Sequence, residues 1–203
     1  MELSSITPTP AGLRALAHPT RLRMLGLLRH EGAATATTLA TRLGLNTGAT
    51  SYHLRQLAKH GFVEDDAGRG NGRERWWRAA HQATRTNADS YAEQGEQQTF
   101  DAYLQAVTVL YTERLQRAVE ERALLPRAWR RASTYSDWGL RVTPARARAL
   151  LDVVAAQVEG WDEEPESAEA GQFVVQLCAF PEPGTVTGTG PGTGPGAGTA
   201  AGA

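Results

Sequence analysis

Hydrophobic positions in the first sixty residues recur every three or four residues, in short runs separated by glycine or proline. The runs cover about residues 10–17, 19–32, 35–44 and 46–61. This spacing predicts amphipathic helices. Pro19 suits the first position of the second helix because its missing N–H would have no partner there. Thr35 can cap the third helix and Gly44 can close it, so the chain is predicted to open with four short helices.

The pattern becomes strand-like after Gly61. The runs FVEDD and RERWWRAA are short and extended in character, and the segment AGRGNG between them contains glycines that allow a tight reversal. A β-hairpin is therefore predicted. Only one of Trp76 and Trp77 can face the interior, because neighbouring residues of a strand point to opposite sides.

A long helix is predicted from about residue 88 to 124, where Gly95 is the position at which it could break. Its apolar stripe consists of Phe100, Leu104, Val107, Tyr111, Leu115 and Ala118. Beyond it, Trp138, Leu140 and Val142 alternate as in a strand, a helix starts at Thr143 and Pro144, and the alternation returns from Phe173 to Ala179. Strand, helix and strand predict a small α/β unit.

The predicted fold class is mainly α with small β elements. Five segments follow from the patterns: a flexible N-terminus (1–9), an N-terminal domain (10–82), a long helix (83–125), a small C-terminal α/β unit (126–182) and a Gly/Thr/Pro/Ala tail (183–203). The tail contains no charged residue and one valine, so it is expected to be disordered.

Charge is divided unevenly along the 203 residues, although the net charge is only -1. Residues 1–82 hold eleven basic and six acidic side chains, whereas the remainder holds ten and sixteen. A positive N-terminal part favours a polyanionic partner. No apolar run reaches the ~18 residues of a membrane span, no secretory signal is visible, and the single cysteine, Cys178, fits a reducing cytoplasm.

The third and fourth helices, with a turn near Gly44, have the helix-turn-helix arrangement, in which one helix braces a second that lies in the major groove. If Thr50, Leu54 and Leu57 face the core, polar side chains occupy the opposite side of the fourth helix. These are Thr47, Ser51, Tyr52, Arg55, Gln56 and Lys59. Such groups can reach base edges and phosphates; a solvated helix face is the alternative explanation.

Arginines in the predicted hairpin favour the nucleic-acid interpretation. They are Arg69, Arg73, Arg75 and Arg78. Guanidinium groups on a loop and strand suit contacts with phosphates or with a narrow minor groove. The predicted binding residues in the hairpin are Arg69, Arg73 and Arg75, and the predicted partner is double-stranded DNA.

Three pieces of residues 11–82 resemble the DNA-binding domain of ArsR-type winged-helix regulators: LAHPTRLRML, TSYHLRQLAKHGFVE and the wing ending in RERWWR. The resemblance implies a homodimeric, repressor-like regulator that inserts its fourth helix into the major groove, with Thr47, Ser51, Tyr52 and Arg55 as DNA contacts. Metal sensors of the family carry cysteines on the third helix or histidine and acidic ligands on the last. This third helix, TATTLATRL, has no cysteine and the long helix no histidine, so neither metal nor cofactor is expected.

Catalysis is not expected, because Ser51 and His53 are two apart on a helix and point in different directions, and no phosphate loop is present. A ligand sensor is the sharper alternative. Its C-terminal half would bind a small-molecule effector and control DNA release, with a pocket lined by Tyr103, Tyr111, Tyr135, Trp138 and Trp161. Their helical or strand spacing favours core positions over a pocket.

A homodimer is predicted because one short helix reads only a few base pairs, so specificity usually needs two half-sites. The long helix, with its apolar stripe, is the expected dimerisation element.

Overall fold

A computed structural model describes residues 4–69, 74–86, 88–91, 93–165 and 167–186. The chain divides into two units, residues 1–173 and 174–203. Arg73, one of the predicted DNA contacts, lies outside the described residues, as does the part of the predicted tail from 187 to 203.

Four short helices open the chain, as predicted. They are α1 (Pro10–Leu16), α2 (Pro19–His30), α3 (Ala36–Leu43) and α4 (Thr47–Lys59). The Thr35 hydroxyl accepts a hydrogen bond from the Thr38 N–H at 3.1 Å, and the Asn46 side chain accepts one from the Ala49 N–H at 2.8 Å. Gly44 ends α3 with φ at 65°, a left-handed conformation that glycine adopts without strain. Local capping chemistry therefore sets the helix limits.

The predicted hairpin is formed by β3 (Val63–Asp65) and β4 (Trp76–Ala79). A third strand that the sequence pattern did not indicate, β2 (Ala34–Thr35), pairs with the other edge of β4, giving the antiparallel order β2-β4-β3. Trp77 is buried and Trp76 is half-buried, so the alternation along the strand does turn only one of them inward.

The N-terminal core is made of side chains from the first helices and the start of the hairpin. Its fully buried members are Leu13, Leu16, Met24, Leu25, Leu54, Leu57 and Phe62. A Cβ at Gly12 would lie 3.4 Å from the Phe62 ring, so the glycine lets α1 approach the residue that leads into β3. The apolar sides of α2 and α4 thus face one another across this core, which leaves the polar side of α4 outside.

The segment predicted as a flexible N-terminus, 1–9, contains a short strand. Ser5–Ile6 form β1, which pairs in parallel with β5 (Ala83–Thr84). The buried Tyr91 donates its hydroxyl hydrogen bond to the Pro8 carbonyl at 2.6 Å. Both partners lie more than seventy residues away along the chain, so local composition could not reveal them.

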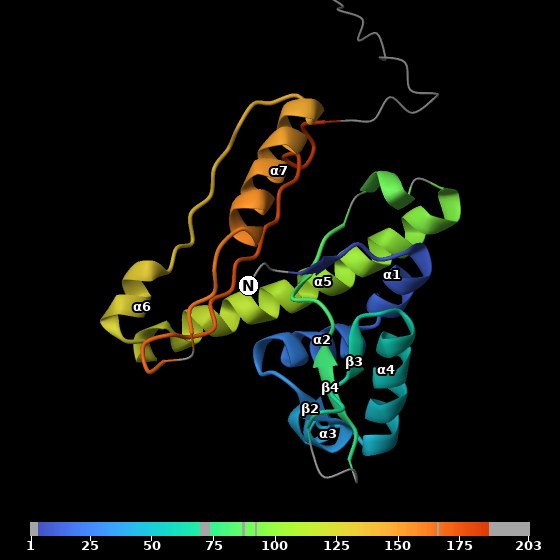
Figure 1. Cartoon of the computed structure of the whole chain (residues 1–203). Helices are drawn as coiled ribbons and strands as arrows, with labels where there is room; N and C mark the ends of the chain where they lie inside the picture. The colour runs from blue at the N-terminus through green and yellow to red at the C-terminus, as the bar shows by residue number, and fades with distance from the viewer. Residues whose placement is uncertain (1–3, 70–73, 87, 92, 166, 187–203) are drawn as a thin grey trace, which may run out of the picture. The chain divides into compact units, whose positions relative to one another are not determined.

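The long helix α5 spans Gln94–Glu121, preceded by a 3-10 turn at Ala88–Tyr91 and followed by another at Arg122–Leu124. It continues through Gly95, so the interruption lies before that residue rather than at it. Figure 1 shows α5 crossing α1 and α2, with which it packs. The predicted apolar stripe is divided: Phe100 and Val107 pack against the N-terminal core, while Leu104 and Leu115 are exposed.

The C-terminal half of the first unit contains α6 (Arg127–Ala132) and α7 (Pro144–Glu159). The predicted helix is present, but residues 138–142 form no strand. Residues 173–179, which run into the second unit, also form none. Alternating apolar residues make a strand only when a neighbouring strand supplies hydrogen-bond partners, and neither segment has one within the described chain. The fold class, mainly α with few strands, is confirmed.

Candidate nucleic-acid interface

The outward side of α4 carries the side chains that the pattern predicted. Thr50, Leu54 and Leu57 are buried. Thr47, Tyr52, Arg55 and Lys59 are exposed, and Ser51 and Gln56 are half-buried. The helix is therefore amphipathic in the expected sense, with its hydrogen-bonding groups accessible along one side.

A hollow of about 290 Å³ lies between α4, the start of α3 and the hairpin. Its lining residues are Thr35, Ala36, Thr37, Ser51, Arg55, Glu74, Arg75 and Trp77. The first N–H groups of a helix have no partner within the helix and attract anions. The hollow thus combines the N-terminal end of α3, the Ser51 hydroxyl and the side chains of Arg55 and Arg75, which suit one phosphate of a nucleic-acid backbone, with one carboxylate, Glu74, which repels it.

Two arginines of the hairpin form ion pairs with carboxylates of the same hairpin, which the sequence did not indicate. Arg75 Nε lies 2.8 Å from a carboxylate oxygen of Asp65, and Arg78 is similarly paired with Glu64 at 2.7 Å. The Arg75 guanidinium also lies over the Trp77 ring, 4.1 Å from its centroid. These contacts hold Arg75 at the edge of the hollow while leaving it more than half exposed. They offset part of the positive charge that the sequence attributed to the hairpin.

Arg69 differs from its neighbours because it stacks on Trp76, at 5.4 Å from the ring centroid, and has no carboxylate partner among the described residues. Its charge is available to a partner beside the hairpin. Of the nine predicted binding residues, the structure therefore brings Ser51, Arg55 and Arg75 into one hollow and places Arg69 on the adjacent loop.

Thr35 and Thr37 were not among the predicted binding residues, although both line the hollow. The sequence indicates Thr35 only as a helix cap. The signal that could have found them is the helix-turn-helix pattern itself, because the same turn that presents α4 also turns the start of α3 to that side.

Two histidines join the start of α2 to the inner side of α4. The His18 and His53 rings lie 4.7 Å apart, and His18 Nδ1 accepts a hydrogen bond from the Thr20 N–H at 3.2 Å, capping α2. Burial lowers the pKa of both imidazoles, and the charge of Arg21 lowers them further. The neutral ring is the form this cap needs, because a protonated Nδ1 cannot accept.

We expect stability to fall with acidification below about pH 6.5. Burial also lowers the pKa of His30 and His60, so these histidines bind fewer protons folded than unfolded. Their contribution is complete above the ordinary value of 6.5 and is lost as pH falls through it toward the lower folded pKa. Urea unfolding at about pH 8 and pH 5 measures this. The His53→Gln variant should show a smaller loss, and equal wild-type stability at both pH values would contradict the expectation.

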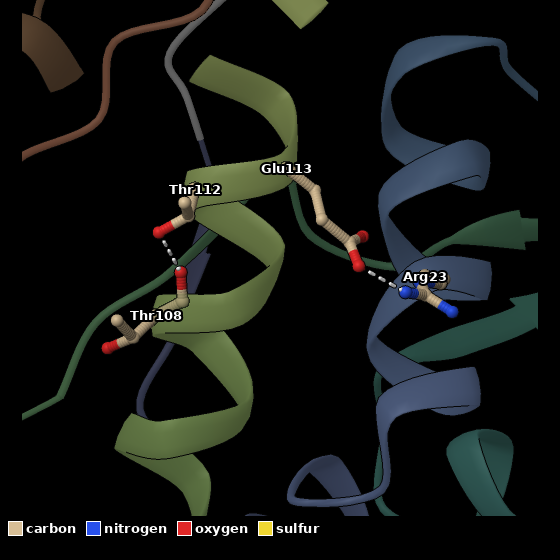
Figure 2. A network of polar contacts seen from close by, with 4 residues as sticks. All are labelled: Arg23, Thr108, Thr112 and Glu113. Carbon is tan, nitrogen blue, oxygen red and sulfur yellow. Dashed lines mark hydrogen bonds and ion pairs between the residues drawn. The ribbon is translucent and has the colours of Figure 1, made fainter. Parts of the chain in front are cut away.

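The long helix is fastened to the domain that presents α4. Figure 2 shows Arg23 of α2 and Glu113 of α5 pointing toward one another, with 2.6 Å between their charged groups. On α5 the Thr112 hydroxyl donates to the Thr108 carbonyl at 2.9 Å. Tyr103 is buried against the same domain. Because α5 packs directly on α1 and α2, its position determines where a second copy bound to α5 would present its own α4.

The five aromatic residues do not form the pocket that the alternative function, a ligand sensor, would need. Tyr103 belongs to the N-terminal core, whereas Trp138 and Trp161 are 79% and 76% exposed. Within the described ranges no group of three or more His, Cys, Asp or Glu side chains could hold a metal ion. In the same ranges no helix has the length and apolar character needed to cross a membrane.

Residues 16–66 match the family model of a helix-turn-helix domain. Three solved structures are similar. The homodimeric winged helix-turn-helix DNA-binding domain of Mb0332 from Mycobacterium bovis, a possible ArsR-family transcriptional regulator, is 30% identical, with 39% of this chain and 65% of that chain covered and a TM-score of 0.31. A possible transcriptional regulator for arsenical resistance is 26% identical (54% and 94% covered, TM-score 0.30).

The third structure, an apo mutant of ZitR from Lactococcus lactis, is 13% identical (70% and 82% covered, TM-score 0.32). This chain spans only 65% of the length of the Mycobacterium bovis domain. No curated protein is significantly similar to this chain. Residues 16–66 are thus similar to helix-turn-helix domains, and the β3–β4 hairpin overlaps and follows this segment.

Proposed function

We propose that this chain, whose residues 16–66 are a helix-turn-helix domain, is a sequence-specific DNA-binding transcriptional regulator that acts as a homodimeric repressor in the cytoplasm. The hollow between α3, α4 and the hairpin is the observation that carries the proposal. It adjoins the exposed side of α4 and gathers groups suited to a phosphate. No catalytic step is assigned to the chain.

In the proposed complex α4 lies in the major groove and its neighbours hold the backbone. Arg55 is exposed and can read guanine with two hydrogen bonds, and Gln56 can read adenine. Ser51 and Lys59 suit phosphates, and Thr47 and Tyr52 extend the contact surface. Arg69 and Arg75 would follow the backbone beside the hairpin, with Arg75 oriented by Asp65. Arg73 belongs to the same proposed set.

The proposed homodimer uses the exposed side of α5. Leu104, Leu115 and Val119 are exposed and lie on one face of the helix, displaced from the face that packs on the N-terminal core. Pairing this face with its copy would remove apolar surface from water and set two α4 helices at a fixed separation. Two half-sites about one helical turn apart are the expected target. The related Mycobacterium bovis domain is a homodimer.

Replacing Arg55 by alanine is expected to weaken binding to the preferred duplex by about 1–3 kcal/mol, about 5- to 150-fold, because a base contact is lost. The duplex is first selected from a random pool, which also reports whether the site is palindromic. Fluorescence anisotropy with the labelled duplex then measures the dissociation constant.

The matched control is Arg117→Ala, which removes the same charge from an exposed position on α5. Its affinity should stay within about twofold of wild type, since distant charges are screened at physiological salt. Equal losses in both variants would show that only net charge matters and that α4 does not read bases. Failure of the purified protein to bind any duplex at low salt would refute the proposed function.

A further inference from the structure

Residues 124–173 expose many large hydrophobic side chains. They are Leu124, Leu125, Tyr135, Trp138, Leu140, Val142, Leu150, Val153, Val158, Trp161 and Phe173. No described residue in this segment is buried, and neither α6 nor α7 has a buried member. Monomeric proteins rarely leave contiguous apolar patches larger than a few hundred Å² in water. The segment therefore has the composition of a folded module without the core that one copy of the chain would need.

Residues 138–142 also leave their backbone without strand partners. Trp138, Leu140 and Val142 point to one side of the extended chain by alternation. No backbone hydrogen bond joins residues 134–142 to any other described residue. An extended apolar segment with free N–H and C=O groups is a template for pairing with another strand.

The distribution of charge along this segment indicates which molecule binds its apolar surface. Residues 127–148 hold six arginines and one aspartate, whereas residues 149–173 hold seven acidic side chains and no basic one. Two such segments related by a two-fold axis and running antiparallel place each basic half opposite the acidic half of the other copy. Residues 174–203 cannot do this, because they contain one charged side chain, Glu182, and the described ion pairs join only Glu159 of this segment to the first 123 residues, through Arg85.

The charges of α7 argue in the same direction. Arg146 and Arg148 lie near its N-terminal end and Glu159 at its C-terminal end, which opposes the helix dipole. An isolated helix would gain from the reverse order. Glu159 is paired with Arg85 of the same chain at 3.2 Å. In an antiparallel pair the basic end of each α7 would therefore meet Glu163 and Glu164, which follow the other α7 in the chain.

We propose that residues 124–173 close against the same residues of a second copy of this chain, antiparallel, and form an intersubunit module beyond the contact through α5. Exposed Leu115 and Val119 near the end of α5 lead into this segment, so the two surfaces are continuous. The inference rests on the proposed homodimer and adds to it a second contact that sets subunit orientation. Stable interfaces use about 20–30 residues from each partner, which this segment provides.

Two charge-reversed variants of the full-length chain test the module. One carries Arg131→Glu and Arg141→Glu, and the other carries Glu163→Arg and Glu164→Arg; no ion pair joins these side chains to one another within the described chain. Each variant alone should dimerise at least about tenfold more weakly than wild type, because like charges meet across the axis. An equimolar mixture should form a heterodimer with wild-type stability. Native mass spectrometry distinguishes it from either homodimer.

Arg69→Glu, a reversal on the hairpin, is the control and should leave the dimer unchanged. Circular dichroism checks that each variant remains folded. Wild-type dimerisation of both variants, or a mixture that contains no more heterodimer than chance, would overturn the proposal, as would a wild type that stays at the 21.9 kDa chain mass. DNA is absent from these measurements, so their outcome is independent of the duplex titration that tests the proposed function.

Discussion

An aspartate in place of Leu115 is expected to dissociate the dimer and to lower affinity for a duplex with two half-sites by about 100- to 10,000-fold. Leu115 is 51% exposed on the proposed dimer face of α5, where one carboxylate from each subunit would have to be buried between the apolar faces. Once the subunits separate, the second half-site no longer binds at the high effective concentration that linkage provides. Sedimentation and duplex titration measure the two effects.

Val109→Asp is the matched control for this change. Val109 is 56% exposed on the same helix but points to a different side. It introduces the same charge into an equally solvated position, so it should leave both the dimer and the affinity close to wild type. If Val109→Asp and Leu115→Asp behaved alike, the dimer face of α5 would be placed wrongly.

Removal of the Trp77 side chain is expected to cost about 3–5 kcal/mol of unfolding free energy, the usual loss for a buried tryptophan cut back to alanine. Trp77 is 4% exposed and lies on β4 opposite Ala34 on one side and Asp65 on the other. Its ring also supports the Arg75 guanidinium at the edge of the hollow. Duplex affinity measured well below the unfolding transition should therefore fall as well. Urea denaturation followed by far-UV circular dichroism gives the stability.

Trp76→Ala supplies the comparison, since Trp76 is the adjacent residue on the same strand but is half-buried and faces the other side. Its loss is expected to cost about 1 kcal/mol, typical of a partly exposed position. If Trp76→Ala lowered the unfolding free energy as much as Trp77→Ala, the two rings would contribute alike to stability. The sheet would then not be packed on one face only.

Much of the candidate interface could be predicted from residues 10–82 because local chemistry decides it. Thr35, Gly44 and Asn46 are residues whose side chains or backbone freedom end helices, and they do so here. The three-to-four spacing of Thr50, Leu54 and Leu57 determines which side of α4 is buried, and hence that Arg55 faces out. None of this requires knowledge of distant residues.

Local chemistry does not determine which distant residue each side chain or strand contacts in the fold. Arg75 and Arg78 looked like free cations, but register in the hairpin places Asp65 and Glu64 beside them. Strand β1 depends on a partner more than seventy residues away. The strand predicted at 138–142 is not formed for the converse reason: its residues alternate as a strand requires, but no strand in the described part of the chain pairs with them.

The sequence by itself determined the four helices, the hairpin, the outward side of α4 and the long helix, because periodicity and capping act over a few residues. Only the tertiary structure decided that the start of α3, Ser51, Arg55 and Arg75 share one hollow, and that the apolar stripe of α5 is divided between a packed and an open face. Both depend on the angles at which elements pack, and those angles are set by the whole core rather than by any single segment.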